Sequence, residues 1–203
     1  MKDQSVVPEL LLQKLKKTFN QFVPVPEEDW HQVLPYIQVM KLKKGDYFIK
    51  EGQICNVVGL INQGILRVYY TAEGKEITSY FNSSHRNPIV SAFYSFLSRK
   101  PSLESIHALE DSELIVIDHV KLGILYDQYP LFQKLGRLMA EQNYLASIRR
   151  IYSFQHKPAQ ERYEELLRKY KHVIHQIPQH YIASYLGITP ESLSRIRANI
   201  AKK

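Results

Sequence analysis

The side chains best placed for chemistry lie near the C-terminus, on the outward face of a predicted helix. That helix starts at Thr189-Pro190, and its outer face carries Glu191, Ser194 and Arg195. Carboxylate, hydroxyl and guanidinium groups on one exposed face can hydrogen-bond to an anionic polymer and to the edges of bases. The chemistry expected there is recognition by hydrogen bonds and charge.

The elements that must position this face are predicted from the segment QHYIASYLGITPESLSRIRANI, which runs from Gln179 to Ile200. Its pattern predicts two short helices joined by a glycine turn at Gly187, where φ is often positive. Thr189 is a natural N-cap, and Pro190 fits the first position of the second helix. The residues expected to be buried are Ile182, Ala183, Leu186, Leu193, Ile196 and Ile200. This pattern is typical of a helix-turn-helix. A helical hairpin at the end of an unrelated domain is the alternative.

The distribution of charge agrees with a polyanion-binding C-terminus. The chain has 203 residues and a net charge of +7, and its length suits one moderate domain plus a small one. From Pro158 onward, eight basic residues face four acidic ones, so +4 of that charge lies in the last quarter. The basic residues are Arg162, Arg168, Lys169, Lys171, Arg195, Arg197, Lys202 and Lys203. Solvation of an ordinary surface is the alternative role for such charges.

Other chemistries find little support in the sequence. The single cysteine, Cys55, excludes an internal disulfide and a cysteine-ligated iron–sulfur cluster within one chain. A cupin-like metalloenzyme would need clustered histidines, typically with a His-x-His pair. The eight histidines contain no such pair: they are His31, His85, His107, His119, His156, His172, His175 and His180. We therefore expect neither an enzyme nor a metal site, and we expect no cofactor.

The N-terminal sequence lacks the features of a secretory signal, and no apolar run approaches the ~18 residues of a membrane span. We expect a cytoplasmic protein without a membrane partner.

From Ile37 to about Asp118 the apolar period changes to two, and β-branched and aromatic residues dominate. Glycines at Gly45, Gly52 and Gly64 mark the corners between short strands. The pattern predicts an antiparallel sandwich or barrel. Two amphipathic helices, over residues 9–22 and 27–34, are expected to cap it.

A long helix is predicted from Leu131 to about Phe154, after a shorter helical stretch that begins near Val120 and is interrupted at Pro130. Its seam has roughly heptad spacing and comprises Leu131, Leu135, Leu138, Gln142, Leu145, Arg149 and Tyr152, widened by Met139 and Ile148. The helix is longer than a small β domain needs, which indicates pairing with a second copy of the chain. Packing of the seam wholly against its own domain is the alternative.

The order of these parts resembles the Crp/Fnr family of bacterial transcription regulators. The glycine corners at Gly45, Gly52 and Gly64 are similar to those of the cyclic-nucleotide-binding β-roll, and the segment from Tyr181 to Arg197 resembles a cytophaga- and bacteroides-type subgroup. The implied fold class is α+β: an N-terminal antiparallel β-roll (double-stranded β-helix) with flanking helices, a long dimerisation helix, and a small all-α helix-turn-helix domain without a clear wing. The corresponding domains are residues 1–130, 131–157 and 158–203.

This resemblance implies a homodimer joined along the helix from Leu131 to Phe154, bound to double-stranded DNA with recognition helices ~34 Å apart. RNA polymerase is a further partner that it leaves open. The family's first base-reading arginine is absent here, so Arg195 is the candidate for a bidentate contact with guanine and Glu191 for an acceptor from cytosine. Stabilisation of the first helical turn is the alternative role of Glu191. Thr189, Ser192 and Arg197 are candidates for phosphate contacts, and Ser194 completes the predicted DNA-binding set. A sensor or scaffold that has lost DNA binding is the alternative function.

The sensory region departs from the family pattern. No Gly-Glu pair for a ribose occurs near Ser91 to Phe93, and Ser102, Leu103 and Glu104 stand where a phosphate-binding arginine is expected. A carboxylate there would repel a phosphate, so we expect no cyclic AMP binding of the usual kind. Arg99 and Lys100 are either a substitute anion site or exposed loop charges. The predicted effector pocket thus comprises Ser91, Phe93, Arg99, Ser102, Leu103 and Glu104.

Overall fold

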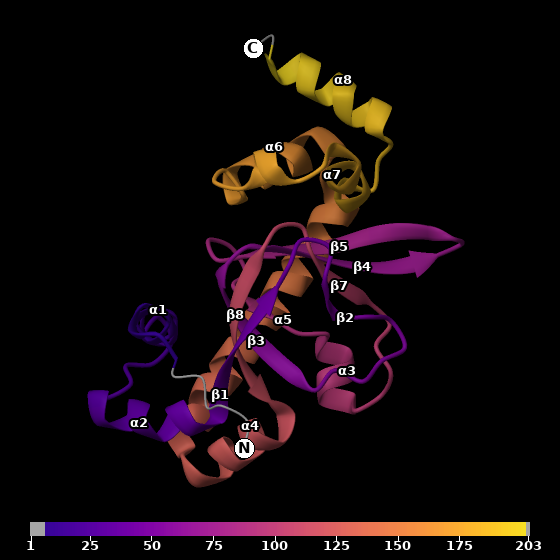
Figure 1. Ribbon diagram of the computed structural model, residues 1–203. Helices are drawn as coiled ribbons and strands as arrows, with labels where there is room; N and C mark the ends of the chain where they lie inside the picture. The colour runs from indigo at the N-terminus through magenta and orange to yellow at the C-terminus, as the bar shows by residue number, and fades with distance from the viewer. Residues whose placement is uncertain (1–6, 202–203) are drawn as a thin grey trace.

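The structure is a computed structural model that describes residues 7–201. Two antiparallel β-sheets form its centre (Figure 1). One sheet has the strand order β1-β8-β3-β6, and the other has the order β2-β7-β4-β5. The strands are β1 (Ile37–Leu42), β2 (Tyr47–Ile49), β3 (Val57–Gln63), β4 (Ile65–Ala72), β5 (Lys75–Ser83), β6 (Ile89–Val90), β7 (Ser105–Ala108) and β8 (Ser112–Asp118). The predicted α+β class with an antiparallel β-roll is confirmed.

The corners of the roll depend on glycine, as the sequence predicts. Gly45, Gly52 and Gly64 all have positive φ. Gly64, between β3 and β4, has φ +108°, and a Cβ there would lie 2.0 Å from the Ser112 hydroxyl. Only glycine combines that backbone angle with so close an approach. At this corner the chain passes from β3 in the first sheet to β4 in the second, and Ile61, Leu66 and other apolar side chains form the core between the sheets.

The N-terminal helices cover one end of the roll. They are α1 (Glu9–Phe19), the 3-10 turn η1 (Glu27–Asp29), α2 (Trp30–Val33) and the 3-10 turn η2 (Leu34–Tyr36). Trp30, at 2% exposure, and Leu15 pack in one apolar cluster with Leu60 and Ile115 of the first sheet. These short helices therefore serve as a cap, in agreement with the sequence analysis.

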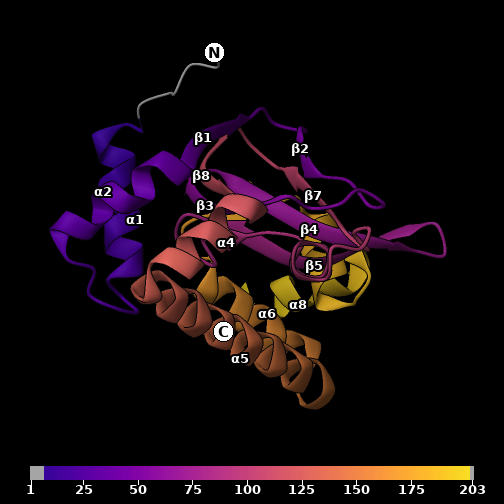
Figure 2. The ribbon, with the colours of Figure 1, turned by 90° about the horizontal axis from the view of Figure 1, so that it is seen from below.

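The long helix α5 (Pro130–His156) follows α4 (His119–Gln128) and runs along the outside of the roll (Figures 1 and 2). Its predicted seam divides into two parts. Leu135 is buried in the apolar cluster to which α1, α2, α4 and the first sheet of the same chain also contribute. Farther along, Leu145 and Tyr152 are 49% and 59% exposed. The prediction of one continuous seam for a partner is corrected here, because the first turns of α5 are needed by the chain's own core.

The C-terminal helices form a compact unit that packs on the roll. They are α6 (Ala159–Lys169), the 3-10 turn η3 (Ile174–Gln176), α7 (Gln179–Leu186) and α8 (Pro190–Ala201). Their apolar cluster includes Leu166, Ile182 and Leu193, and it also takes in Ile65 and Phe81 from β4 and β5. The hydroxyl of Tyr170 donates to the carbonyl oxygen of Phe81 at 2.8 Å. One core therefore joins the C-terminal helices to the β-roll.

The region between β5 and β8 contains elements that the alternating pattern does not reveal. Besides β6 and β7 it includes α3 (Phe93–Ser98), which ends at Arg99 with a left-handed φ of +59°. Strands of two to four residues are too short to show a clear period. In the described part of the chain, residues 7–201, no helix has the length and apolar character needed to span a membrane. Over the same residues, no group of three or more His, Cys, Asp or Glu side chains is placed to hold a metal ion.

Candidate nucleic-acid interface and effector pocket

The turn between α7 and α8 has the geometry that the sequence predicts. Gly187 ends α7 with φ +65°, and the backbone N–H of Ile188 donates to the carbonyl oxygen of Ala183 at 3.1 Å. A Cβ on Gly187 would lie 3.0 Å from the ring of Phe154 in α5. The oxygen of the Thr189 side chain accepts from the N–H of Ser192 at 3.2 Å, which confirms the predicted N-cap. The direction of α8 is thus set by local backbone geometry.

The outer face of α8 carries the predicted DNA-binding side chains in the open. Figure 1 shows α8 at the end of the molecule, beyond α6 and α7. Thr189, Glu191, Ser194 and Arg195 are exposed, and Ser192 is half-buried. Hydrogen bonds from the backbone N–H of Glu191 and from the Thr189 side chain lower the pKa of the Glu191 carboxyl. Glu191 is therefore an acceptor near neutral pH.

Arg197 lies on a different flank from Arg195. It lines a shallow hollow between the start of α7 and α8, together with Gln179, Leu193 and Ser194. Successive helical residues are separated by about 100°, so positions two apart point in roughly opposite directions. The two arginines therefore cannot serve the same contact. Ile196 and Ile200, predicted to be buried, are only half-buried here, and Lys202 and Lys203 lie outside the described residues.

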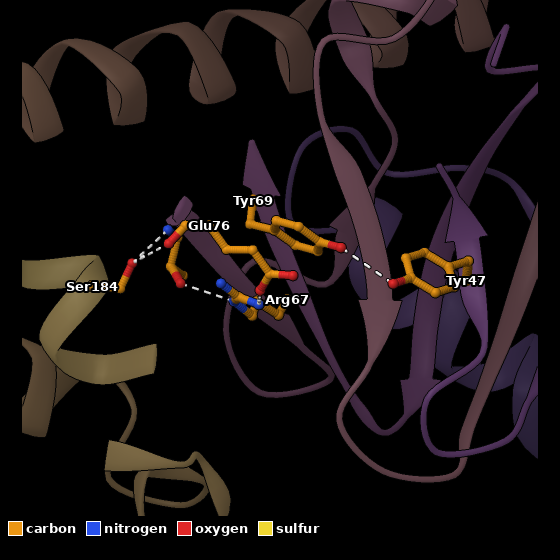
Figure 3. Close-up of polar contacts among 6 residues, drawn as sticks. Tyr47, Arg67, Tyr69, Glu76 and Ser184 are labelled. Atoms are coloured by element: carbon orange, nitrogen blue, oxygen red, sulfur yellow. Dashed lines mark hydrogen bonds and ion pairs between the residues drawn. The ribbon is translucent and has the colours of Figure 1, made fainter. Parts of the chain in front are cut away.

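A polar contact fixes α7 to the β4–β5 hairpin (Figure 3). The Ser184 hydroxyl accepts from the backbone N–H of Thr78 at 2.9 Å and donates to the carbonyl oxygen of Glu76 at 3.2 Å. Both backbone groups belong to β5, which is an edge strand of its sheet. The Ser184 hydroxyl therefore gives hydrogen-bond partners to two backbone groups that no neighbouring strand would pair. The helix that supports α8 is thereby attached to the roll.

Arg67 lies at the centre of this contact and is completely buried. Its Nε donates to the Thr78 hydroxyl at 2.9 Å, and its Nη1 pairs with the Glu76 carboxylate at 2.6 Å. The guanidinium lies 4.3 Å from the ring centre of Tyr69 and 3.7 Å from that of Tyr181 in α7. Arg67 Nη2 is a buried donor without an acceptor among the described residues. This arginine therefore joins strand and helix by charge and by stacking.

The sequence analysis did not identify Arg67 as important. The available signal was a charged residue within the apolar run ILRVYY, where alternation alone would place it on an exposed face. Burial and the hydrogen bond with Tyr47 raise the pKa of the neighbouring Tyr69 to about 12. Burial and the charge of Arg67 lower the pKa of His107, which packs against Tyr69 and Tyr181. The Tyr69 hydroxyl and the His107 imidazole therefore favour their neutral forms, and Glu76 is the charged group that pairs with Arg67.

The hydroxyls of the predicted effector pocket are occupied by the protein itself. Buried Ser91 donates to the carbonyl oxygen of Val57 at 2.9 Å. Buried Ser102 donates to the carbonyl oxygen of Glu104 at 2.6 Å and accepts from its N–H at 3.2 Å. Burial raises the pKa of the Glu104 carboxyl to about 7. These side chains stabilise a turn, and their arrangement resembles no phosphate cradle.

The other three predicted pocket residues also point to structural roles. Arg99 donates from Nη1 to the carbonyl oxygens of Cys55 at 2.7 Å and Phe96 at 3.2 Å. This guanidinium connects α3 to the segment before β3, so neither alternative offered for it, an anion ligand or a free loop charge, describes it fully. Leu103 is 64% exposed, and Phe93 is half-buried. Among the six residues, the hydrogen bonds described here join only Ser102 and Glu104 to each other.

Comparison with known proteins agrees with this architecture. Residues 39–129 match the family model described as the cyclic nucleotide-binding domain. No curated protein matches the sequence. Many solved structures are similar to the chain, at identities low enough that the likeness concerns the fold.

Three of these structures cover most of the chain. FixK2 from Bradyrhizobium japonicum has a TM-score of 0.66 at 19% identity, over 82% of this chain and 85% of that one. A mutant of CooA from Carboxydothermus hydrogenoformans has a TM-score of 0.64 at 19% identity, over 98% and 87%. The c-di-GMP responsive global regulator CLP from Xanthomonas campestris has a TM-score of 0.67 at 11% identity, over 87% and 92%. Residues 39–129 accordingly match the cyclic nucleotide-binding domain, and the chain as a whole shares the fold of these three structures, the CAP/Crp fold.

Proposed function

We propose that this protein is a sequence-specific DNA-binding transcription regulator that acts as a homodimer, and that it is not an enzyme. The observation that carries the proposal is the exposed face of α8, with Glu191 and Arg195 held by the Gly187 turn and the Thr189 cap. A capped helix with a free polar and basic face is the element that enters a major groove in helix-turn-helix proteins. RNA polymerase is a further partner that this function leaves open.

The two flanks of α8 would make different contacts. Arg195, on the outer face, suits a bidentate contact with guanine, and ionised Glu191 suits an amino group of cytosine. Arg197 faces the hollow beside Gln179 and is suited to a phosphate, which sets the position of the helix but not the sequence that it reads.

A second copy of the chain would pack along the later turns of α5. The apolar side chains there recur at the spacing of one helix face: Tyr144 (66% exposed), Leu145 (49%), Ile148 (half-buried), Ile151 (51%) and Tyr152 (59%). A contiguous exposed apolar stripe of this kind usually marks an interface. The sensory roll of each copy would not take cyclic AMP in the usual way, since Ser91, Ser102 and Arg99 already bind the protein's own carbonyl groups.

The DNA-binding proposal is tested by selecting sites from a randomised duplex library with the purified protein. We expect enrichment of a palindrome, lost in Arg195→Ala and retained in Arg168→Ala, which removes the same charge from an exposed position on α6. One bidentate contact to a base is worth about 1–3 kcal/mol, or roughly 5- to 150-fold in affinity. No enrichment at low salt, with or without nucleotides, would instead favour a sensor or scaffold that has lost DNA binding.

Dimerisation is tested by light scattering after size-exclusion chromatography. Leu145→Glu should give a monomer, because it places a charge within the apolar stripe. The matched control is Leu97→Glu on α3, where the leucine is 72% exposed and lies outside the stripe. Equal behaviour of the two variants would contradict an interface along α5.

A further inference from the structure

A cavity of about 130 Å³ lies where α5 passes β5 and meets α6 and α7. Its walls combine the roll, through Tyr80 and Arg86, with α5, through Arg149 and Arg150, and with α6, through Arg162. None of the six residues of the predicted effector pocket lines it. It is therefore a separate site, at the junction between the roll and the C-terminal helices.

The cavity is strongly positive. Five cationic side chains and one carboxylate line it, a net charge of +4: Arg86, Arg149, Arg150, Arg162 and Lys169, with Glu165. Glu165 already pairs with Lys157 and Lys169. Within residues 7–201, no ion pair involves the four arginines. Among the described residues, no direct ion pair therefore offsets the mutual repulsion of the four arginines.

The two inner arginines have hydrogen-bond acceptors but no neutralising charge. Arg150 Nη2 donates to the carbonyl oxygen of Tyr185 at 3.1 Å, and Arg162 Nη2 donates to that of Leu186 at 2.8 Å. These carbonyls end α7, where the helix dipole favours a cation. Even so, burial and the nearby charge of Arg150 lower the pKa of Arg162. Arg162 Nε is also a buried donor with no acceptor among the described residues.

The two outer arginines are free for a ligand. Arg86 and Arg149 are exposed, and neither guanidinium takes part in a hydrogen bond or an ion pair within the described residues. Tyr80 and Phe154 line the same cavity and provide flat apolar walls. The cavity therefore has two exposed guanidinium groups that are free of hydrogen bonds within the described part of the chain, Arg86 and Arg149, and two half-buried ones that are held by hydrogen bonds, Arg150 and Arg162.

We propose that this cavity binds a phosphate or diphosphate group of a small anionic molecule. Guanidinium groups bind phosphate oxygens in pairs, and such charge-assisted bonds are the strong ones. Pockets that enclose a whole drug-sized ligand measure about 300–1,000 Å³, so this cavity suits one anionic group with the rest of the molecule outside.

Such a ligand would strengthen the attachment of the C-terminal helices to the roll, because residues of both parts line the cavity. An effect on DNA affinity would rest on the proposed function, whereas binding of the anion would not. The two are therefore measured separately.

The test is calorimetric titration of the full chain with pyrophosphate at low ionic strength. We expect saturable binding with one site per chain. The double variant Arg86→Gln/Arg149→Gln should weaken it by about tenfold or more, since two charge-assisted contacts are lost. Neither side chain supports the fold through a hydrogen bond, and unchanged thermal unfolding would confirm that the double variant is folded. The control Arg168→Gln removes an exposed charge from α6 outside the cavity and should bind pyrophosphate like the unmodified chain.

Equal weakening by Arg168→Gln, or titration without saturation, would show general attraction to a basic surface and would overturn the proposal. Displacement of pyrophosphate by duplex DNA, with loss of DNA affinity in the double variant, would make the cavity a DNA backbone contact and would also overturn it. Loss of DNA binding in Arg195→Ala with unchanged pyrophosphate affinity would support a site independent of α8.

Discussion

Glu104 allows the structure to be tested through pH. The carboxyl lies in the turn before β7, and burial raises its pKa from 4.5 to about 7. The folded chain therefore binds this proton more tightly than the unfolded chain does. Stability from this group is fully present below pH 4.5, declines as the pH rises, and is lost above pH 7. Replacing Glu104 with glutamine removes the ionisable group while keeping its shape.

The expected size of the effect follows from the two pKa values. A difference between 4.5 and about 7 means that, relative to low pH, the unfolding free energy has fallen by about 1 kcal/mol at pH 5 and by about 3 kcal/mol at pH 8.5. Any constant effect of the amide cancels when the two conditions are compared. Glu104→Gln should thus gain about 2 kcal/mol relative to the unmodified chain between pH 5 and pH 8.5.

Urea denaturation followed by circular dichroism at the two pH values measures this gain. The control is Glu51→Gln, in the exposed turn after β2, which should follow the pH dependence of the unmodified chain. If Glu104→Gln shows no gain on raising the pH, the carboxyl is solvated or paired in solution, and the reasoning from its burial is wrong.

The remaining predictions concern the C-terminal helices and a matched glycine. Ser184→Ala should lower the unfolding free energy by about 1–3 kcal/mol, because it leaves the buried N–H of Thr78 without an acceptor; a change below 0.5 kcal/mol (roughly the value for a neutral surface position) would contradict this. Gly187→Ala should cost about 1–2 kcal/mol, since φ is +65° and the added Cβ would crowd Phe154. Gly123→Ala, on α4 with open space around it, should instead stabilise by about 0.5–1 kcal/mol in the same denaturation assay.

Local chemistry explains which parts of the fold the sequence predicts well. Gly187, Thr189 and Pro190 act on their own backbone, so the turn and the start of α8 could be inferred from residue types alone. The glycine corners at Gly45 and Gly64 are equally local. The helices and the longer strands could be predicted because burial of one face spaces the apolar residues at the helical or the strand period.

The parts that could not be predicted depend on contacts between distant segments. Arg67 is buried because Tyr181, more than a hundred residues later, covers it. The cationic cavity brings together Arg86, Arg149 and Arg162 from three elements. The spacing of Leu135 predicts a place in a partner-binding seam, whereas in the structure it is buried in a cluster with side chains of the N-terminal helices and the first sheet. The spacing of residues along the sequence does not show which distant segments will pack against them.

The shared core of β5 and the C-terminal helices affects how the molecule comes apart. Phe81 packs edge to face against Tyr170, with 6.2 Å between ring centres, and its carbonyl oxygen accepts the Tyr170 hydroxyl. Separating the helices from the roll would expose that core to water and would remove the ring of Tyr181 from the guanidinium of Arg67. The two regions should therefore melt in one cooperative calorimetric transition, and a fragment that starts at Pro158 should not keep a fixed structure by itself. Residues 158–203, which the sequence predicts to be a separate domain, should therefore unfold together with the sheet on which they pack.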